Sequence, residues 1–194
     1  MANATTTKRT KKAAPDQGRH SGERTVLRPV MADDLPVLQA WDADPVIIAL
    51  MGRKFQEMNA DDWFRSLDAE RNCRAWVIEN HEGRLVGELE LAQVNWRAGT
   101  AELRICIGER DCWNLGYGTD AIRTALRVAF DTMGLQAVYL RVFTTNDRAV
   151  HVYERLGFRK QAILQPSARR ADPSPVLLMN LSRDRWYMKQ TVSA

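Results

Sequence analysis

The sequence lacks the features of a membrane-spanning, disulfide-stabilised or metal-stabilised protein. No apolar run approaches the ~20 residues that a helix needs to cross a bilayer, and residues 1–5 have none of the apolar character of a secretory signal. Histidine is scarce and scattered, and the three cysteines are an odd set without CxxC spacing: Cys73, Cys106 and Cys112. We therefore expect a cytoplasmic protein without a metal or a disulfide framework.

Acidic and large apolar residues are both rare at the start of the chain. Residues 1–24 hold six basic residues against two acidic ones, so they account for the whole net charge of +4. Such a segment cannot bury enough surface to offset the chain entropy lost on folding, so we expect a disordered basic arm at 1–24. The arm could make weak contact with nucleic acid or ribosomes, or be a solvated tail. The near-neutral remainder argues against nucleic-acid binding by the folded domain.

Hydrophobic residues make up 45% of the chain, enough for one domain with a substantial core, which we place at residues 25–188, before a tail at 189–194. Apolar periodicity and turn residues predict the order β-α-α-β-β-β-α-β-α-β-β. The expected strands cover residues 25–30, 75–78, 85–91, 100–108, 137–143, 159–164 and 175–181, and the expected helices begin near residues 35 and 63 and cover 119–133 and 147–156. This order implies an α/β protein with a mixed sheet.

The most informative segment follows the strand at 100–108. Gly116 and Gly118 stand at alternate positions immediately before the helix expected from Thr119. Such glycines let the backbone curl closely, and a helix N-terminus adds unpaired N–H donors and a favourable dipole, so this loop is suited to a diphosphate. It is neither a Walker loop, because no Gly-Lys-Ser/Thr follows, nor a dinucleotide fingerprint, because the third glycine is absent. A turn without a ligand is the alternative.

Two motifs resemble those of the GCN5-related N-acetyltransferase (GNAT) superfamily. Residues 113–118 (Trp-Asn-Leu-Gly-Tyr-Gly) resemble its Gln/Arg-x-x-Gly-x-Gly/Ala pattern, with Trp first as in the branch of ribosomal-protein N-terminal (RimJ/RimL-like) and spermidine acetyltransferases. Residues 146–158 are similar to that branch's N-x-x-A-x-x-x-Y-x-x-x-G-F signature. The resemblance covers roughly residues 25–188. It implies a GNAT-like, mostly antiparallel sheet of six to seven strands flanked by about four helices.

The resemblance also implies an activity. The chain would move an acetyl group from acetyl-coenzyme A (acetyl-CoA), used as co-substrate without a metal, to a primary amine within a ternary complex. A protein N-terminus, a polyamine and an aminoglycoside-like small molecule all stay open as acceptors. The acidic residues that could attract a cationic amine are equally well explained as helix caps: Asp42, Asp44, Glu57, Asp61 and Asp62. Homodimers are common in this branch. The alternatives are an acetyl-CoA-binding sensor without turnover and a ribosome-associated protein.

The coenzyme-binding residues expected from the loop and the resemblance are Cys106, Ile107, Gly108, Trp113, Asn114, Leu115, Gly116, Tyr117, Gly118, Thr119, Asn146 and Ala149. A backbone N–H near Cys106 and Ile107 would stabilise the oxyanion, because the family strand bulges there. No His/Asp set accompanies Cys106, so we expect no covalent role for its thiol.

Two residues are expected to be catalytic. The resemblance brings Tyr153 close to the coenzyme sulfur, where a phenol can donate to the departing thiolate; packing beside Phe158 is the alternative. Glu102 matches the general-base glutamate of histone acetyltransferases in this superfamily. A carboxylate of pKa ~4.3 is a weak base for an ammonium ion, so it would need water or a raised pKa. An exposed carboxylate paired with Arg104 or Arg97 is the alternative, and Glu88 and Glu90 are rival bases.

Overall fold

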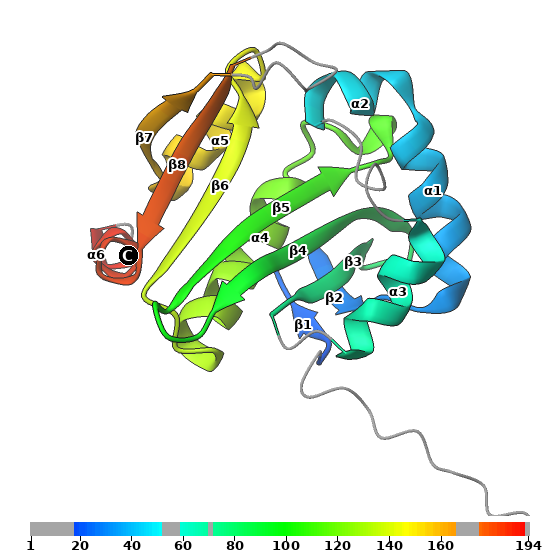
Figure 1. Ribbon diagram of the computed structural model, residues 1–194, viewed down its shortest axis with the longest axis horizontal. Coiled ribbons are helices and arrows are strands. Elements are labelled where there is room, and N and C mark those ends of the chain that lie inside the picture. The colour runs from blue at the N-terminus through cyan, green and yellow to red at the C-terminus, as the bar shows by residue number, and fades with distance from the viewer. Residues whose placement is uncertain (1–17, 52–58, 70–71, 166–174, 193–194) are drawn as a thin grey trace, which may run out of the picture.

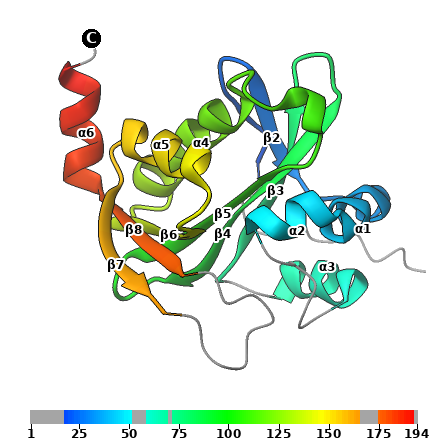
Figure 2. The ribbon, with the colours of Figure 1, turned by 90° about the horizontal axis from the view of Figure 1, so that it is seen from above.

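The computed structural model describes residues 18–51, 59–69, 72–165 and 175–192, and these form a twisted sheet with helices on both faces (Figures 1 and 2). The strands lie in the order β1-β2-β3-β4-β5-β6-β8-β7: β1 (His20–Ser21), β2 (Thr25–Pro29), β3 (Arg74–Asn80), β4 (Leu85–Asn95), β5 (Thr100–Ile107), β6 (Ala137–Phe143), β7 (Arg159–Leu164) and β8 (Val176–Ser182). The helices are α1 (Leu35–Ala43), α2 (Pro45–Met51), α3 (Ala60–Ala69), α4 (Tyr117–Arg127), α5 (Asp147–Leu156) and α6 (Arg183–Val192), and a π-helical turn (Val128–Thr132) continues α4.

Strand direction confirms the predicted fold class. Every neighbouring pair is antiparallel except β5 and β6, which run parallel. Within the described residues the sheet has eight strands rather than six or seven, because the two-residue β1 was not predicted. Helix α2 was not predicted either, because Asp44-Pro45 interrupts the apolar periodicity. Proline is favoured at the first helical position, and the Asp44 carboxylate caps this helix by accepting the Val46 N–H at 2.8 Å.

Two apolar clusters, one on each face of the sheet, hold the layers together. Helices α4 and α5 pack on the first, which contains Leu103 of β5, whereas α1 packs on the second, which contains Cys106. Side chains alternate between the faces of a strand. Glu102 and Arg104 therefore share the face of Cys106.

Described elements extend past both predicted domain boundaries. His20 and Ser21 pair with Leu27 and Val26, so the folded domain begins before residue 24. The rest of the predicted arm, residues 1–17, lies outside the described residues. At the other end, α6 continues through the predicted tail to Val192. These boundaries were missed because β1 is very short and α6 is mostly polar.

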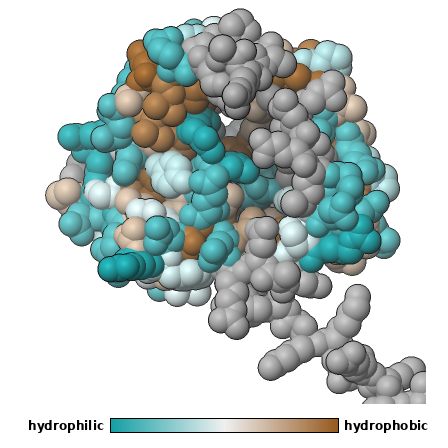
Figure 3. Space-filling view, viewed as in Figure 1, coloured by the Kyte–Doolittle hydropathy of each residue, from teal (hydrophilic) through white to brown (hydrophobic). Residues whose placement is uncertain are grey.

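Strand β7 is the edge of the sheet, and all six of its residues are exposed. Two of them are large and apolar: Ile163 is 59% exposed and Leu164 is 40% exposed. Hydrophobic side chains gather near this end of the sheet (upper left in Figure 3). An edge strand with unpaired backbone groups and apolar side chains is suited to pair with another chain.

The carboxylate of Asp120 ties the first turn of α4 to the start of β2. It is 5% exposed and accepts four hydrogen bonds, from the backbone N–H groups of Glu23 (3.0 Å), Arg24 (3.0 Å) and Thr25 (2.9 Å) and from the Thr25 hydroxyl (2.7 Å). Burial would raise the pKa of Asp120, but these donors outweigh it and hold the pKa below its usual value. The bonds join segments almost 100 residues apart, so they position the loop that precedes α4.

Replacing this carboxylate should weaken the fold. We expect Asp120→Asn to lower the free energy of unfolding by about 2 kcal/mol at pH 7, because an amide NH2 would face buried donors. Urea denaturation measures this, with the exposed Glu82→Gln as a control that changes stability by less than about 0.5 kcal/mol.

The folded-state pKa of Asp120 lies below the unfolded one, so its contribution is present above pH ~4 and is lost as the pH falls through the folded-state pKa. Equal stability of the wild type and Asp120→Asn at pH 7 would contradict the prediction.

Candidate active site

The loop between β5 and α4 ends in a left-handed glycine at a helix N-terminus, and the helix starts two residues before the predicted Thr119. Gly116 at the helix N-cap has φ 86°, a left-handed conformation that favours glycine, and the helix begins one residue later, at Tyr117. The Trp113 indole N–H donates to the Ile107 carbonyl at 2.7 Å and so fixes the loop on the end of β5. The N–H groups of the first turn of α4 have no partner within their helix and can serve an anion.

Gly108, which follows β5, and Gly118, in the first turn of α4, have different roles. A Cβ on Gly118 would lie 3.5 Å from the Ile107 side chain, an ordinary contact, so the protein itself does not require glycine there. A Cβ on Gly108 would lie 2.0 Å from the Trp41 ring. The absence of a side chain at Gly108 thus lets α1 approach β5, whereas at Gly118 it keeps the surface of the loop open.

A cleft of about 850 Å³ opens where β5 and β6 separate. These strands pair only from Thr100–Glu102 to Ala137–Tyr139, and beyond that point they diverge (Figure 1). The cleft extends from the loop before α4, across this gap, to α1 and α2. Most of the predicted site residues line it: Glu102, Cys106, Ile107, Trp113, Asn114, Gly116, Tyr117, Gly118, Thr119, Asn146, Ala149 and Tyr153. Gly108 and Leu115 do not.

The predicted bulge at the end of β5 is absent. Cys106 and Ile107 pair in regular register with Glu88 and Gly87 of β4, and the irregularity of this pair of strands lies farther along, between Ala92 and Asn95. The divergence of β5 from β6 exposes backbone groups instead. Among the described residues, no β5–β6 pair follows Glu102–Tyr139, so the facing backbone edges border the cleft.

Tyr153 projects from α5 into the inner end of the cleft. It is 9% exposed, and its ring lies edge-on to Phe158 with the centroids 5.8 Å apart, so it also packs as the alternative interpretation expected. Burial, with a smaller effect from Cys106, raises the pKa of Tyr153 to about 12. The hydroxyl is therefore protonated at neutral pH and can donate a hydrogen bond.

Asn146 caps α5. Its Oδ1 accepts the Ala149 N–H at 3.2 Å, and its Nδ2 donates to the Leu50 carbonyl at 3.4 Å. The same side chain therefore starts α5 and holds the end of α2 against the cleft.

The surroundings of the Glu102 carboxylate differ from those that were predicted. It is 2% exposed, and it accepts bonds from Arg141 Nε at 2.7 Å, Arg141 Nη2 at 2.8 Å and Arg104 Nη2 at 2.9 Å. Burial opposes the ionised carboxylate, but the two guanidinium groups outweigh it and lower the pKa of Glu102. The pairing with Arg104 matches the alternative interpretation, although the carboxylate is buried rather than exposed. Arg141 was missed, because the contact depends on two strands that are far apart in sequence.

A second missed residue lies beside the loop. The Arg148 guanidinium is 4.2 Å from the centroid of the Trp113 ring, close enough for a cation–π interaction. Arg148 occupies a variable position of the α5 motif, so the motif did not identify it. Arg148 therefore adds a positive charge to the cleft, on the side that the loop before α4 forms.

The predicted acidic residues separate into two groups. Asp42 lines the cleft. Asp44 caps α2 and pairs with Arg110, and Asp62 pairs with Arg65, so these two have structural partners. Glu57 lies outside the described residues. The cleft also contains Glu88 and Glu90 of β4, so its acidic character comes mainly from the sheet.

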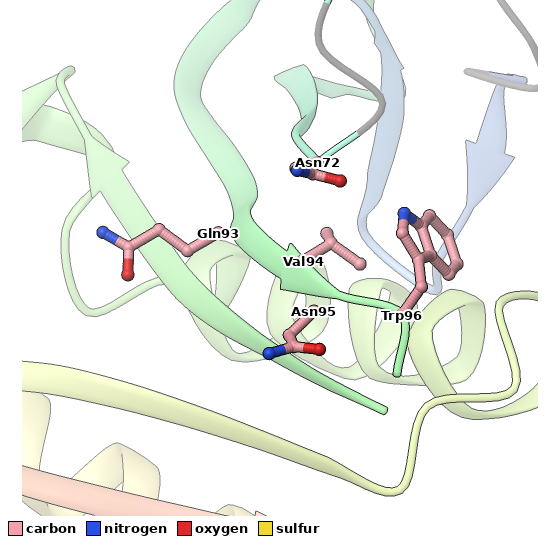
Figure 4. Close-up of a pocket in the computed structure, with 5 residues that line it drawn as sticks. All are labelled: Asn72, Gln93, Val94, Asn95 and Trp96. Carbon is pink, nitrogen blue, oxygen red and sulfur yellow. The ribbon is translucent and has the colours of Figure 1, made fainter. Parts of the chain in front are cut away.

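A separate hollow of about 360 Å³ lies at the irregularity of β4 (Figure 4). Its lining residues are Asn72, Gln93, Val94, Asn95 and Trp96. None of these side chains ionises near neutral pH, so the hollow has no acid, base or nucleophile. Gln93 also borders the large cleft and accepts a hydrogen bond from the Tyr139 hydroxyl at 3.1 Å.

Comparison with known proteins agrees with this geometry. A family model described as an acetyltransferase (GNAT) domain matches residues 24–159. The chain is 25% identical over 140 residues to an uncharacterised protein of Methanocaldococcus jannaschii, covering 71% of this chain and 28% of that protein. It is 33% identical over 91 residues to a spermidine N(1)-acetyltransferase of Vibrio cholerae, covering 47% of this chain and 52% of that protein. The matches thus span about half or less of these two relatives.

A solved structure has the same fold. The crystal structure of spermidine N-acetyltransferase from Vibrio cholerae in complex with CoA and spermine superposes with a TM-score of 0.75 at 23% identity. The alignment covers 84% of this chain and 98% of that chain.

Proposed function

This chain belongs to the GNAT acetyltransferase family, and we propose that it transfers an acetyl group from acetyl-CoA to a primary amine by direct attack within a ternary complex. The proposal is supported by a cleft that joins the N-terminus of α4 to a buried, protonated tyrosine through the gap between β5 and β6. Two substrates entering this gap from opposite ends would meet beside Cys106 and Tyr153.

The first turn of α4 would hold the coenzyme pyrophosphate. Residues 116–119 line the cleft with the N-terminal end of a helix, where N–H groups and the dipole favour an anion. Arg148, stacked on the Trp113 ring of the same loop, supplies a positive charge nearby. The exposed edges of β5 and β6 would accept the pantetheine arm as an added strand.

The acetyl transfer balances without a metal or a covalent enzyme intermediate. The amine nitrogen attacks the thioester carbonyl carbon, the new C–N bond forms, and the C–S bond breaks. A hydrogen bond from the Tyr153 hydroxyl stabilises the sulfur as it becomes a thiolate of pKa ~8.5. An acceptor that starts as an ammonium loses one proton before its nitrogen attacks and a second one from the tetrahedral adduct. The departing thiolate takes up one of these protons and the solvent takes the other, so the products are an N-acetylamide, free coenzyme A and one proton.

Because the pKa of Glu102 is lowered, this carboxylate is better suited to position neighbouring side chains than to take a proton directly from the amine. Its carboxylate is held by two guanidinium groups, so it would order Arg104 and Arg141. Glu88, the register partner of Cys106, is the carboxylate of β4 placed beside the reacting groups, where it could accept the amine proton directly or through water.

Calorimetric titration with acetyl-CoA tests the proposal. We expect saturable binding of acetyl-CoA and none of ATP or NADH, followed by amine-dependent thiol release in an acceptor screen. Failure of the folded protein to bind acetyl-CoA would overturn the proposal. Tight binding without thiol release for any amine would identify a sensor instead of an enzyme.

We also propose that the chain forms a homodimer. The fully exposed edge strand β7, with Ile163 and Leu164, supports pairing with a second copy.

None of the described helices combines the length and the apolar character that spanning a bilayer requires.

A further inference from the structure

We propose that the acceptor is a zwitterion, a primary amine that also carries a carboxylate, and that Arg104 and Arg141 bind this carboxylate. The inference rests on the acetyl transfer proposed above and names the class of its acceptor. It depends on three features of the cleft: the fixed orientation of the two arginines, their remaining donors, and their distance from the site of reaction.

Glu102 holds both arginines in place. It projects from β5 between Arg104, two residues along the same strand, and Arg141 of the diverging strand β6. The Glu102 side chain is 3% exposed, whereas those of Arg104 and Arg141 are 46% and 42% exposed and line the cleft. A buried carboxylate thus orients two accessible guanidinium groups, which lowers the entropy cost of binding an anion.

Both arginines keep N–H donors that their bonds to Glu102 do not use. Arg141 uses Nε and Nη2 on Glu102, and within the described ranges no hydrogen bond or ion pair involves its Nη1. Arg104 uses Nη2 on Glu102, and its Nη1 lies 4.0 Å from Glu90. A guanidinium has five N–H donors and matches a carboxylate in a bidentate way. Together with Glu90 the two arginines and Glu102 form a neutral cluster, so the unused N–H donors, rather than an excess of positive charge, would bind the anion.

The spacing of charge along the sheet favours a short peptide. The amine would lie beside Cys106 and its acidic partner Glu88, and Arg104 is two residues away on the same face. Two residues of a strand span roughly 7 Å, which is also about the length of an extended dipeptide. A polyamine in the same position would place a second ammonium group against the arginines, which is repulsive.

The test compares acceptors that differ only in the anion. We expect kcat/KM for glycylglycine to exceed that for glycylglycine amide by about tenfold or more, with spermidine a poorer acceptor than glycylglycine. The Arg104→Gln variant should reduce this preference to less than about threefold, by raising KM for glycylglycine more than KM for the amide. Glu102 keeps Arg141 as a partner in this variant, so the fold is retained. Arg97→Gln, at an exposed turn outside the cleft, is the matched control and should keep the wild-type preference.

Two outcomes separate this inference from the proposed function. Acetylation of the amide or of spermidine at least as fast as that of glycylglycine would overturn the zwitterion inference and leave the acetyltransferase intact. Absence of acetyl-CoA binding in the same preparation would overturn the proposed function and the inference with it.

Discussion

Replacing Tyr153 by phenylalanine is expected to lower kcat about 100-fold or more while acetyl-CoA affinity stays within about twofold of the wild type. The hydroxyl would act only as the thiolate develops, so its loss falls on turnover rather than on binding. The ring keeps its edge-on packing with Phe158 in the variant, so the fold should be unaffected. Thiol-release kinetics and calorimetry measure the two quantities separately.

The matched control is Tyr187→Phe. This tyrosine on α6 is 41% exposed and bonds to Asp131, outside the cleft, so turnover should not change. An equal kcat for Tyr153→Phe and the wild type would remove the hydroxyl from the mechanism.

The pH dependence gives a second check on Tyr153. Because burial raises its pKa to about 12, the phenol stays protonated through the accessible alkaline range. Turnover should therefore rise with pH as the acceptor amine loses its proton, with no alkaline decline due to Tyr153 below about pH 10. A decline that begins below pH 10 in the wild type and is missing in Tyr153→Phe would contradict the assigned protonation state.

The second large effect is expected at the loop before α4. Gly118→Val should weaken acetyl-CoA binding about 100-fold and leave the melting temperature nearly unchanged. The nearest atom to a Cβ at this position is 3.5 Å away, so the protein accommodates the first carbon, while the branched side chain would cover the N–H groups of the helix N-terminus. Losing two charge-assisted hydrogen bonds is worth roughly this factor.

Two glycine variants sharpen this test. Gly118→Ala adds only the accommodated carbon and should weaken binding less than Gly118→Val. Gly108→Ala should give the opposite pattern, a loss of stability of roughly 1–3 kcal/mol, because its Cβ would collide with the Trp41 ring. Unaltered acetyl-CoA affinity in Gly118→Val would show that the pyrophosphate site lies elsewhere.

Local sequence patterns were enough to predict several of the elements that surround the cleft. The predicted bounds of β6, α5 and β7 match the structure, because apolar alternation, a capping asparagine and Gly157 are all local signals. The loop that begins at Trp113 was found for the same reason, although the helix begins at Tyr117 rather than Thr119, so Gly116 is its N-cap and Gly118 lies in its first turn. Local signals did not reveal the short β1 or the mostly polar α6, which are stabilised by their neighbours in the fold.

The sequence by itself therefore determined the family, the order of the central elements and the positions of Gly116, Gly118 and Tyr153. Which charged and polar side chains contact one another was decided only by the tertiary structure. Glu102 lies 39 residues from Arg141, and Asp120 lies 95 residues from Thr25, yet these contacts set both carboxylate pKa values. The physical reason is that a pKa depends on burial and on the nearest charges and donors. Both follow from the pairing and divergence of strands that are distant in the chain.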